Sequence, residues 1–313
     1  MNPNVFKPIP HWATHGGITT DLMFSQVMGS VIEEGDYTVV RRPDSPDFYF
    51  GNFLLLKGAP DNRARERLED DFAALIGVPP RIKHRAFMWP MWPMWPVGAN
   101  EPTALDAFIS AGYELHESTV LIAESADLLE PDHKNHSITI RAYNGKADWD
   151  DWRRLNMADK NVKFPELAYR HFLAGQQALY ERMIAEDRGD WWGAFLGDQQ
   201  VANLGLFFTQ KDDHKHINQH RMQSAHGFTQ GLTGRFQAVL TAPAYRHQGI
   251  CRTLVQAVAK KFFEREGAAR LVMVADEHYH AARIYESLGF SRRERMASLC
   301  WWPRTWTTER FDV

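Results

Sequence analysis

Alternating and helical hydrophobic patterns follow one another along the chain and predict a mixed α/β protein. Between residues 37 and 56, two runs of Val, Tyr, Phe and Leu are separated by Pro and Asp turn residues, which predicts a β-hairpin. A helical pattern follows, in which Leu68, Phe72 and Leu75 recur at intervals of four and three. Gly77 is expected to end that helix.

The second half of the chain repeats this alternation of strands and helices. Its apolar spacing predicts a strand, two helices and a hairpin that turns at Gly197-Asp198, in the segments 137–143, 147–158, 165–186 and 191–208. Two further strands are each followed by a helix, in the segments 235–241, 250–262, 269–277 and 278–290. We therefore expect a mixed sheet flanked by helices in this half.

A polar stretch at 124–136 separates the two halves and is the best candidate for a linker. A length of 313 residues is enough for two domains, each with its own core. We therefore predict one domain at 1–130 and a second at 137–313. The hydrophobic content of 44 % is ordinary for a soluble protein, and the longest apolar runs are far too short to cross a bilayer.

Charge and cysteine content exclude several classes of partner. The formal net charge is -3, and no basic run is dense enough to follow a phosphate backbone, so we expect no nucleic acid partner. The amino terminus lacks the basic start and apolar stretch of a secretory signal. Cys251 and Cys300 are the two cysteines, and so few indicate a reducing compartment. We expect a cytoplasmic protein without disulfides.

The loop that follows the strand ending at Thr241 carries the clearest chemical signal. It reads Arg246-His247-Gln248-Gly249-Ile250-Cys251 and leads directly into a predicted helix. A glycine lets the backbone come close to a ligand, and the free N–H groups and dipole of a helix start favour a pyrophosphate. A short glycine pattern alone is more often only a tight turn. The strand and helix downstream make the phosphate cradle the better interpretation.

This arrangement resembles the GNAT family of acetyltransferases from about Ser137 to Trp301. The loop is similar to the family pattern R-x-x-G-x-[GA], and a second pattern, A-x-x-x-Y-x-x-x-G-F, ends the following helix at Ala281, Tyr285, Gly289 and Phe290. The resemblance implies a GNAT-type fold that binds acetyl-CoA as co-substrate. It implies Tyr285 as the general acid that protonates the departing thiolate. It also implies a set of residues that bind the cofactor: Thr241, Arg246, His247, Gln248, Gly249, Ile250, Cys251 and Arg252.

Two residues depart from the family pattern, and Tyr285 has a second interpretation. Cys251 replaces the usual Gly or Ala, and His278 stands where the family often has Asn. Tyr285 could equally be a core aromatic of an amphipathic helix, packed with Ile284 and Leu288. Cys251 is better explained by packing than as a nucleophile, because it faces the cofactor phosphates in this interpretation.

The two halves share a short motif. Phe108 to Tyr113 and Tyr285 to Phe290 have the aromatic, serine, glycine and aromatic positions in register, each after a predicted helix and before a strand. This indicates an internal duplication, although six residues can also match by coincidence. The first half lacks the loop motif, and Phe108 cannot donate a proton. We therefore expect this half to be a degenerate GNAT-like domain without catalytic function.

Two unusual segments remain. The repeat Met-Trp-Pro runs three times from Met88 to Pro96, and its prolines predict an extended loop, either folded onto its own domain or acting as a lid or dimer contact. The loop 212–227 contains His214, His216, His220 and His226, but no spaced ligand set completes a metal site, so we expect none. One of His216, His226 or Asp213 is a weak candidate for the general base.

The sequence thus predicts an N-acetyltransferase with tandem GNAT-like domains. The acceptor is an amine of a small molecule or a peptide, and the sequence does not identify it. The alternative is a regulatory or interaction protein that binds CoA without turnover. A homodimer is compatible with the sequence but not indicated by it.

Overall fold

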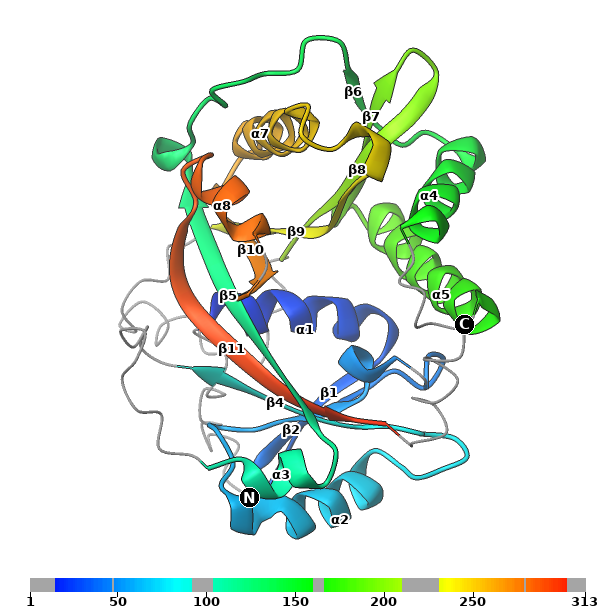
Figure 1. Ribbon diagram of the computed structural model, residues 1–313, viewed down its shortest axis with the longest axis vertical. Coiled ribbons are helices and arrows are strands. Elements are labelled where there is room, and N and C mark those ends of the chain that lie inside the picture. Colours follow the sequence, from blue (N-terminus) through cyan, green and yellow to red (C-terminus); the bar gives the residue numbers. More distant parts are fainter. Residues whose placement is uncertain are drawn as a thin grey trace, which may run out of the picture.

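The computed structural model describes residues 15–46, 48–91, 104–159, 166–209, 231–278 and 280–302. Its strands form one mixed sheet of 11 strands with helices on both faces (Figure 1). The strand order is β1-β2-β3-β4-β11-β5-β10-β9-β8-β7-β6. This confirms the predicted mixed α/β fold.

Most strands lie in or beside the predicted segments, whereas β1 and β4 were not predicted as strands. In the first half they are β1 (Ser30–Glu34), β2 (Tyr37–Arg41), β3 (Phe53–Leu55), β4 (Arg85–Met91) and β5 (Glu114–Glu124). In the second half they are β6 (Thr139–Ala142), β7 (Gly189–Leu196), β8 (Gln199–Phe208), β9 (Leu232–Thr241), β10 (Ala268–Asp276) and β11 (Ser291–Trp301). The hairpin of β7 and β8 turns at Gly197, as predicted.

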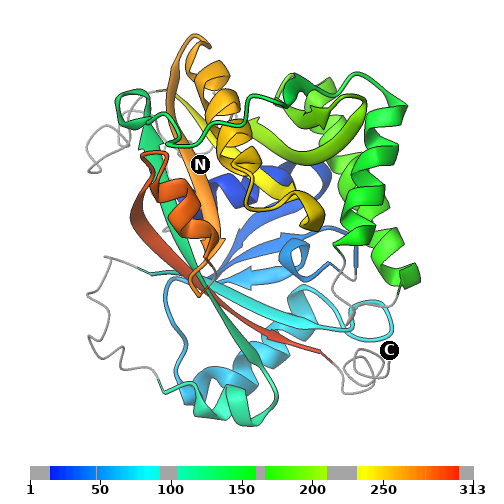
Figure 2. The same cartoon turned by 45° about the horizontal axis from the view of Figure 1, so that its top comes forward.

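The helices lie between these strands in the chain. They are α1 (Gly16–Met28), α2 (Arg65–Leu75), α3 (Asp106–Ser110), α4 (Lys146–Ala158), α5 (Glu166–Ala185), α7 (Ile250–Phe263) and α8 (Ala281–Glu286). α7 and α8 cover one face of the second-half strands, and α4 and α5 cover the other (Figure 2). Within the described residues, no helix is long and apolar enough to cross a membrane.

The two halves exchange their last strands. β5, from the first half, pairs antiparallel with β10 of the second half, while β11, from the second half, pairs antiparallel with β4 of the first. β5 and β11 also pair with each other and run as two long neighbouring strands between the upper and lower parts of the molecule (Figure 1). Each half therefore completes the sheet of the other.

The shared motif occupies the same structural position in both halves. The N–H of Tyr113 donates to the carbonyl oxygen of Phe108 at 3.0 Å, and that of Phe290 donates to Tyr285 at 3.2 Å. The glycine directly before each of these donor residues is left-handed, with a φ of 90° at Gly112 and 96° at Gly289. One turn geometry thus leads α3 into β5 and α8 into β11, which supports an internal repeat.

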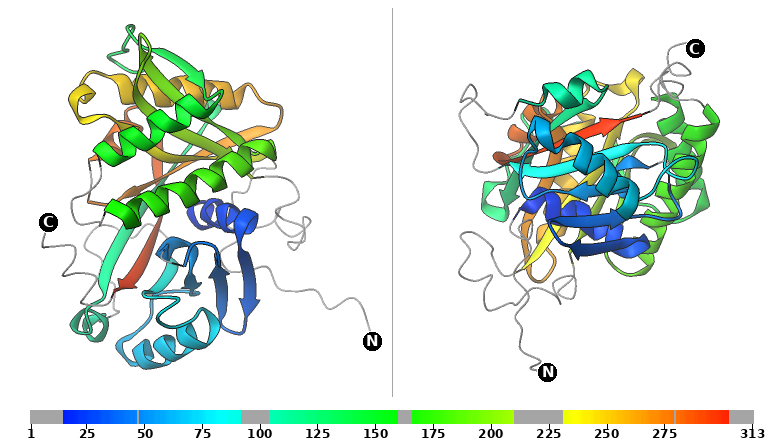
Figure 3. Two further views of the ribbon diagram at one scale, coloured as in Figure 1. Left: turned by 90° about the vertical axis from the view of Figure 1, so that its right-hand side faces the viewer. Right: turned by 90° about the horizontal axis from the view of Figure 1, so that it is seen from below.

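α1 lies where the two halves meet, and the sequence patterns did not indicate it (Figure 3). Its helix start is closed by a carboxylate from β11, because the N–H groups of Gly16 and Gly17 donate to Glu294 at 3.1 and 3.2 Å. Its middle is tied to β9 by an ion pair between Asp21 and Arg235 at 2.7 Å. α1 therefore links the exchanged strand to the second half.

The expectation that the Met-Trp-Pro repeat forms a projecting loop is wrong for its first part. Met88 to Met91 lie in β4, are buried, and pair with β11. Pro90 can lie in this strand because β4 pairs with β3 only as far as Met88, so no neighbour on that side needs its missing N–H. The remainder of the repeat, from residue 92 onward, lies outside the described residues.

Candidate active site

The second half of the sheet opens between two parallel strands. β9 and β10 pair only as far as Arg235 and Val272, although both strands are described throughout and continue to Thr241 and Asp276. Ala238 lies just beyond this point with a left-handed φ of 46°, and the register of β8 against β9 shifts there. A bulge therefore lies where the pairing ends, and beyond it the backbones of β9 and β10 are not hydrogen-bonded to each other.

The predicted cradle loop connects β9 to α7 and has two left-handed residues. His247 has a φ of 63° and Gly249 a φ of 74°. Left-handed residues in a short loop can turn nearby N–H groups toward one side, as they do in anion-binding nests. The sequence could locate the glycine, but the left-handed histidine was visible only in the structure.

The first turn of α7 offers free backbone donors. The first helical hydrogen bond is from the N–H of Thr253 to the carbonyl oxygen of Gly249, at 3.0 Å. In the described part of the chain, no group accepts from the N–H groups of Ile250, Cys251 or Arg252. Three adjacent donors and the helix dipole make this turn suitable for a phosphate.

The side chains of the loop mostly hold the loop itself. Arg246 donates to the carbonyl oxygen of Thr241 at 3.1 Å and pairs with Asp159, at the end of α4, at 2.5 Å. The Gln248 side chain is exposed and makes only a long 3.4 Å hydrogen bond to Ala244. Among the described residues, nothing bonds to the buried Thr241 hydroxyl. The backbone therefore supplies the donors, and Thr241 adds an unused hydroxyl at the end of β9.

Gly249 is required by the fold as well as by the proposed ligand. A Cβ atom built on it would lie 2.6 Å from the carbonyl oxygen of His133, in the linker between the halves. The linker is held there by Asn135, whose side chain donates to the carbonyl oxygen of Gln248 and whose N–H donates to the Thr253 hydroxyl, both at 2.9 Å. A replacement of Gly249 would thus test folding rather than ligand binding.

Tyr285 lies in the core between α8 and the sheet. Its side chain is 6 % exposed, and its ring lies 6.5 Å from that of Phe290. α8 is tied to the cradle, because Arg252 donates to the Ser287 hydroxyl at 3.0 Å. The structure therefore brings the helix that carries Tyr285 next to the first turn of α7. Because this contact uses the side chain of Arg252, the backbone N–H of the same residue stays available to a ligand.

The thiol of Cys251 is unsuited to nucleophilic chemistry. Burial raises its pKa to about 11, although the neighbouring Arg252 acts in the opposite direction. A thiol with so high a pKa is almost wholly protonated at neutral pH and is therefore a poor nucleophile. This agrees with a packing role against the core.

The equivalent position in the first half is closed. There Asp61 caps the short 3-10 turn that leads into α2, and its own carboxylate accepts from the N–H groups of Arg63 and Ala64 at 2.9 and 3.1 Å. β3 also stays paired with β4 up to its end, since the N–H of Leu56 donates to Met88 at 2.7 Å. A negative charge occupies the helix start, and these strands stay paired.

Of the remaining sequence candidates, His278 lies among the described residues. The histidine-rich loop, with His214, His216, His220, His226 and Asp213, is outside the described residues. No group of three or more metal-ligating side chains occurs among the residues that are described. His278 lies beyond β10, 3.4 Å from Glu117 of β5.

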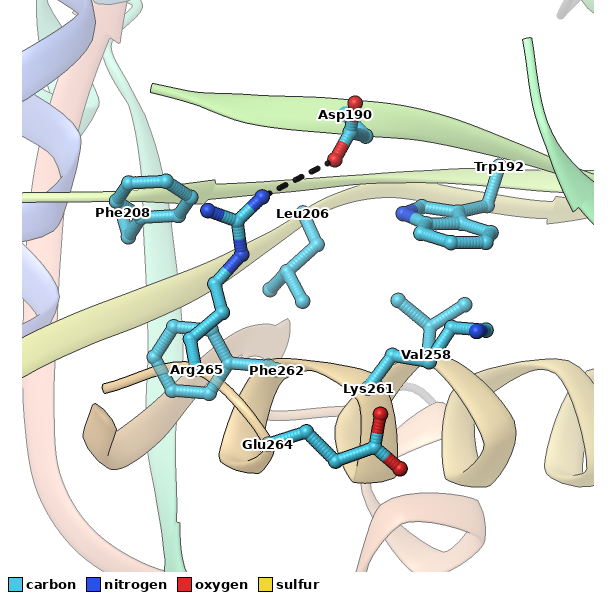
Figure 4. Close-up of a pocket in the computed structure, with 9 residues that line it drawn as sticks. All are labelled: Asp190, Trp192, Leu206, Phe208, Val258, Lys261, Phe262, Glu264 and Arg265. Carbon is cyan, nitrogen blue, oxygen red and sulfur yellow. Dashed lines mark hydrogen bonds and ion pairs between the residues drawn. The ribbon is translucent and has the colours of Figure 1, made fainter. Parts of the chain in front are cut away.

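A pocket of about 250 Å³ lies between the last turns of α7 and the strands β7 and β8 (Figure 4). Lys261 and Arg265 lie at its walls, and Arg265 pairs with Asp190 at 3.5 Å. Lys261 is 11 residues beyond Ile250, which corresponds to about 16 Å along a helix. This pocket is therefore separate from the cradle.

The strain at His247 leads to a first prediction. The left-handed region costs a residue with a Cβ atom about 1–2 kcal/mol, and glycine avoids this cost but loses about 0.5–1 kcal/mol through backbone entropy. His247→Gly should therefore raise the free energy of unfolding by about 0.5–1 kcal/mol, measured by urea denaturation. His247→Ala is the matched control and should give no gain, since it keeps the strain. Equal stability of the two variants would contradict a strained His247.

Known proteins resemble this chain in sequence and in fold. Residues 149–290 match the model of the acetyltransferase (GNAT) family. No curated protein matches the chain. A GCN5-related N-acetyltransferase from Kribbella flavida has a similar fold, with a TM-score of 0.56 and 15 % identity over 92 % of this chain and 95 % of that one.

Two further structures share the fold over nearly the whole chain. A conserved protein of unknown function from Staphylococcus epidermidis gives a TM-score of 0.63 at 15 % identity, covering 88 % of this chain and 94 % of that one. A tandem GNAT protein from the clavulanic acid biosynthesis pathway gives 0.52 at 10 % identity, covering 90 % and 87 %. At these identities the likeness concerns the fold alone. It confirms the tandem GNAT-like architecture predicted from the sequence.

Proposed function

Residues 149–290 form a GNAT domain, and from this premise we propose that the protein transfers an acetyl group from acetyl-CoA to an amine. The observation that carries the proposal is the set of free N–H groups at the start of α7, which follows the strand β9 where it no longer pairs with β10. Members of this family in general transfer an acyl group from acyl-CoA to an amine. The acetyl donor and the amine acceptor are the parts that we add for this chain.

The described residues fit an acyl-CoA in three ways. The N–H groups of Ile250, Cys251 and Arg252 would donate to the pyrophosphate. The unused Thr241 hydroxyl lies at the end of the bulged strand and would bond to the chain that leads from the pyrophosphate along β9. Backbone groups of β9 beyond Ala238 no longer pair with β10, so they are available to a ligand that enters between the strands.

The co-substrate would supply a thioester. A neutral amine would attack its carbonyl carbon, the C–S bond would break to release the thiolate, and the amine nitrogen would lose one proton to water to give the amide. An ordinary thiol has a pKa of roughly 8.5, so a proton donor at the sulfur assists its departure. Tyr285 is the residue that we assign to this role. Its burial excludes competing water, and its helix is anchored to the cradle through Arg252 and Ser287.

The first half would contribute structure and not chemistry. Asp61 fills the helix start that corresponds to the cradle, and its charge would repel a pyrophosphate. Phe108 stands at the position of Tyr285 and carries no proton. The domains at 1–130 and 137–313 thus become a supporting half and a catalytic half, with the exchanged strands β5 and β11 between them.

Titration calorimetry with acetyl-CoA and CoA, followed by an assay of thiol release against a panel of amines, tests the proposal. We expect binding of both ligands and thiol release with at least one class of amine. Binding without release from any amine would favour the alternative, a CoA-binding regulatory protein. Absence of binding would overturn the proposal altogether.

A charge placed at the cradle gives a second prediction. Gln248→Glu adds a carboxylate beside the expected pyrophosphate without changing the shape of an exposed side chain. We expect acetyl-CoA to bind about tenfold more weakly, because like charges near a protein surface repel by roughly 1–2 kcal/mol after screening. Gln248→Met is the neutral control and should bind within about twofold of the wild type. Equal affinity of both variants would move the pyrophosphate site elsewhere.

A further inference from the structure

Arg42 is a buried cation that forms no ion pair with any described residue. It follows β2 directly, and its side chain is only 2 % exposed. Its Nε atom is buried without a hydrogen bond, and no hydrogen bond or ion pair of its guanidinium occurs in the part of the chain that is described. Buried charges are normally paired, because an unpaired one costs several kcal/mol of desolvation. An anionic ligand would therefore offset the desolvation cost of this arginine.

The fold builds a defined place for this side chain. A Cβ atom at Gly29 would lie 3.0 Å from its Cγ atom, and one at Gly51 would lie 2.8 Å from its Cδ atom. The Arg42 N–H donates to the side-chain oxygen of Asn52 at 3.0 Å, which fixes the backbone. Both glycines thus leave room for the stem of this side chain, and the Phe48 ring packs against its charged end.

A second buried arginine differs from Arg42 because it has an anionic partner and a hydrogen-bond acceptor. Arg235, on β9, pairs with Asp21 at 2.7 Å and donates to the Thr20 hydroxyl at 2.9 Å. For Arg42, burial lowers the pKa of the guanidinium, and the nearby Tyr180 and Asp44 offset only part of this effect. The charge of Arg235 is therefore neutralised by a carboxylate, whereas that of Arg42 is not paired with any described residue.

Arg42 lies close to the place where the sheet opens. Its charge lowers the pKa of Tyr180, which burial nevertheless raises to about 12. The Tyr180 hydroxyl in turn accepts from Gln237 at 3.2 Å, and Gln237 immediately precedes the bulge at Ala238. Gln237 faces α5, whereas the neighbouring Phe236 packs in the core beneath α7. Arg42 thus lies across the sheet from α7 and the cradle.

The Phe48 ring packs against the guanidinium, and the rings of Phe50 and Phe172 contact Phe48 in turn. The Phe48 ring centre lies 5.4 Å from the guanidinium carbon and 5.5 Å from the ring of Phe172 on α5. Phe172 and the adjacent Phe50 are 37 % and 40 % exposed. In Figure 3, α5 lies beside α1 over this junction. Partly exposed apolar rings therefore lie near this buried charge.

We propose that Arg42 binds a carboxylate group of the acceptor, so that the acceptor is an amine that also carries a carboxylate, such as an amino acid. The inference rests on the proposed acyl transfer, because it supplies the acceptor for that reaction. A guanidinium binds a carboxylate through two parallel N–H···O bonds. The position beside Gln237 would then direct the amine end of the same molecule toward the unpaired ends of β9 and β10.

Binding of two probes that differ only in this charge tests the proposal without requiring turnover. The full-length protein, saturated with CoA, is titrated with N-acetylphenylalanine and with its primary amide. We expect the carboxylate to bind about tenfold or more tightly than the amide, which is the range of charge-assisted hydrogen bonds. Arg42→Met should reduce this ratio to about one, and Arg42→Lys should retain part of it. Arg63→Met, at a highly exposed arginine, is the control and should keep the ratio.

Several outcomes would overturn the assignment. These are equal affinity for the two probes, no measurable binding of either, an unchanged ratio in Arg42→Met, and tighter binding of phenyl phosphate than of the carboxylate. Arg42→Met should unfold at or above the wild-type temperature, because a neutral side chain replaces an unpaired buried charge. A lower unfolding temperature would instead mark Arg42 as structural. If the ratio holds but no amine releases thiol, the carboxylate site stands and the proposed acyl transfer fails.

Discussion

A fragment of residues 131–313 should fail to fold as a stable monomer, although it contains the whole GNAT domain. β11 would lose both of its neighbours, β4 and β5, and β10 would lose β5. Unpaired central strands expose backbone N–H and C=O groups and the buried faces of Leu299 and Met296. We expect this fragment to aggregate or to show no cooperative unfolding by circular dichroism.

The complementary fragment provides the control. When residues 1–130 and 131–313 are produced together, they should associate, bind acetyl-CoA and unfold in one transition, because the exchanged strands can pair again. A full-length chain cut at a protease site inserted after Pro131 should likewise remain associated. A fragment 131–313 that unfolds cooperatively and binds acetyl-CoA alone would show that the exchange contributes little to stability.

Individual strands and helices were predictable because the spacing of apolar residues along the chain differs between the two. The strand TVV, the helix at Leu68 to Leu75 and the Gly197 hairpin all agree with the structure. The shared motif at Phe108 and Tyr285 also placed two equivalent turns correctly. The expected boundary between residues 130 and 137 stays a prediction.

The pairing of strands from different halves was not predictable in the same way. Period-two alternation shows which face of a strand is buried, but it does not show which strand lies beside it. β5 reads as the last strand of the first half, and only the register of Val120 against Val274 reveals its place beside β10. The strand content was therefore predicted, while the exchange was not.

The site shows a similar division. The glycine pattern located the cradle, since a helix start and Gly249 are both visible in sequence. The bulge at Ala238 and the left-handed His247 carry no sequence signature, because other residue types fill these conformations only when tertiary contacts enforce them. Arg42 was missed for another reason: an arginine after a strand usually lies in solvent, and only the structure buries it.

Loss of a single hydroxyl should separate binding from turnover. Tyr285→Phe keeps the ring that packs in the core and removes only the proposed proton donor. General acid catalysis typically contributes 100-fold or more, so kcat should fall by on the order of 100-fold while the acetyl-CoA affinity stays within about twofold. Thiol release under saturating acetyl-CoA and an accepted amine measures the first quantity, and calorimetry measures the second.

A second tyrosine near the loop provides the matched deletion. Tyr245 donates to Gln199 at 3.1 Å on the surface, so Tyr245→Phe removes an equivalent hydroxyl outside the reaction path and should change kcat by less than about twofold. If Tyr285→Phe and Tyr245→Phe had the same kcat, Tyr285 would be only a core aromatic. A fall in acetyl-CoA affinity together with kcat would point to packing instead, because a lost proton donor leaves ground-state binding unchanged.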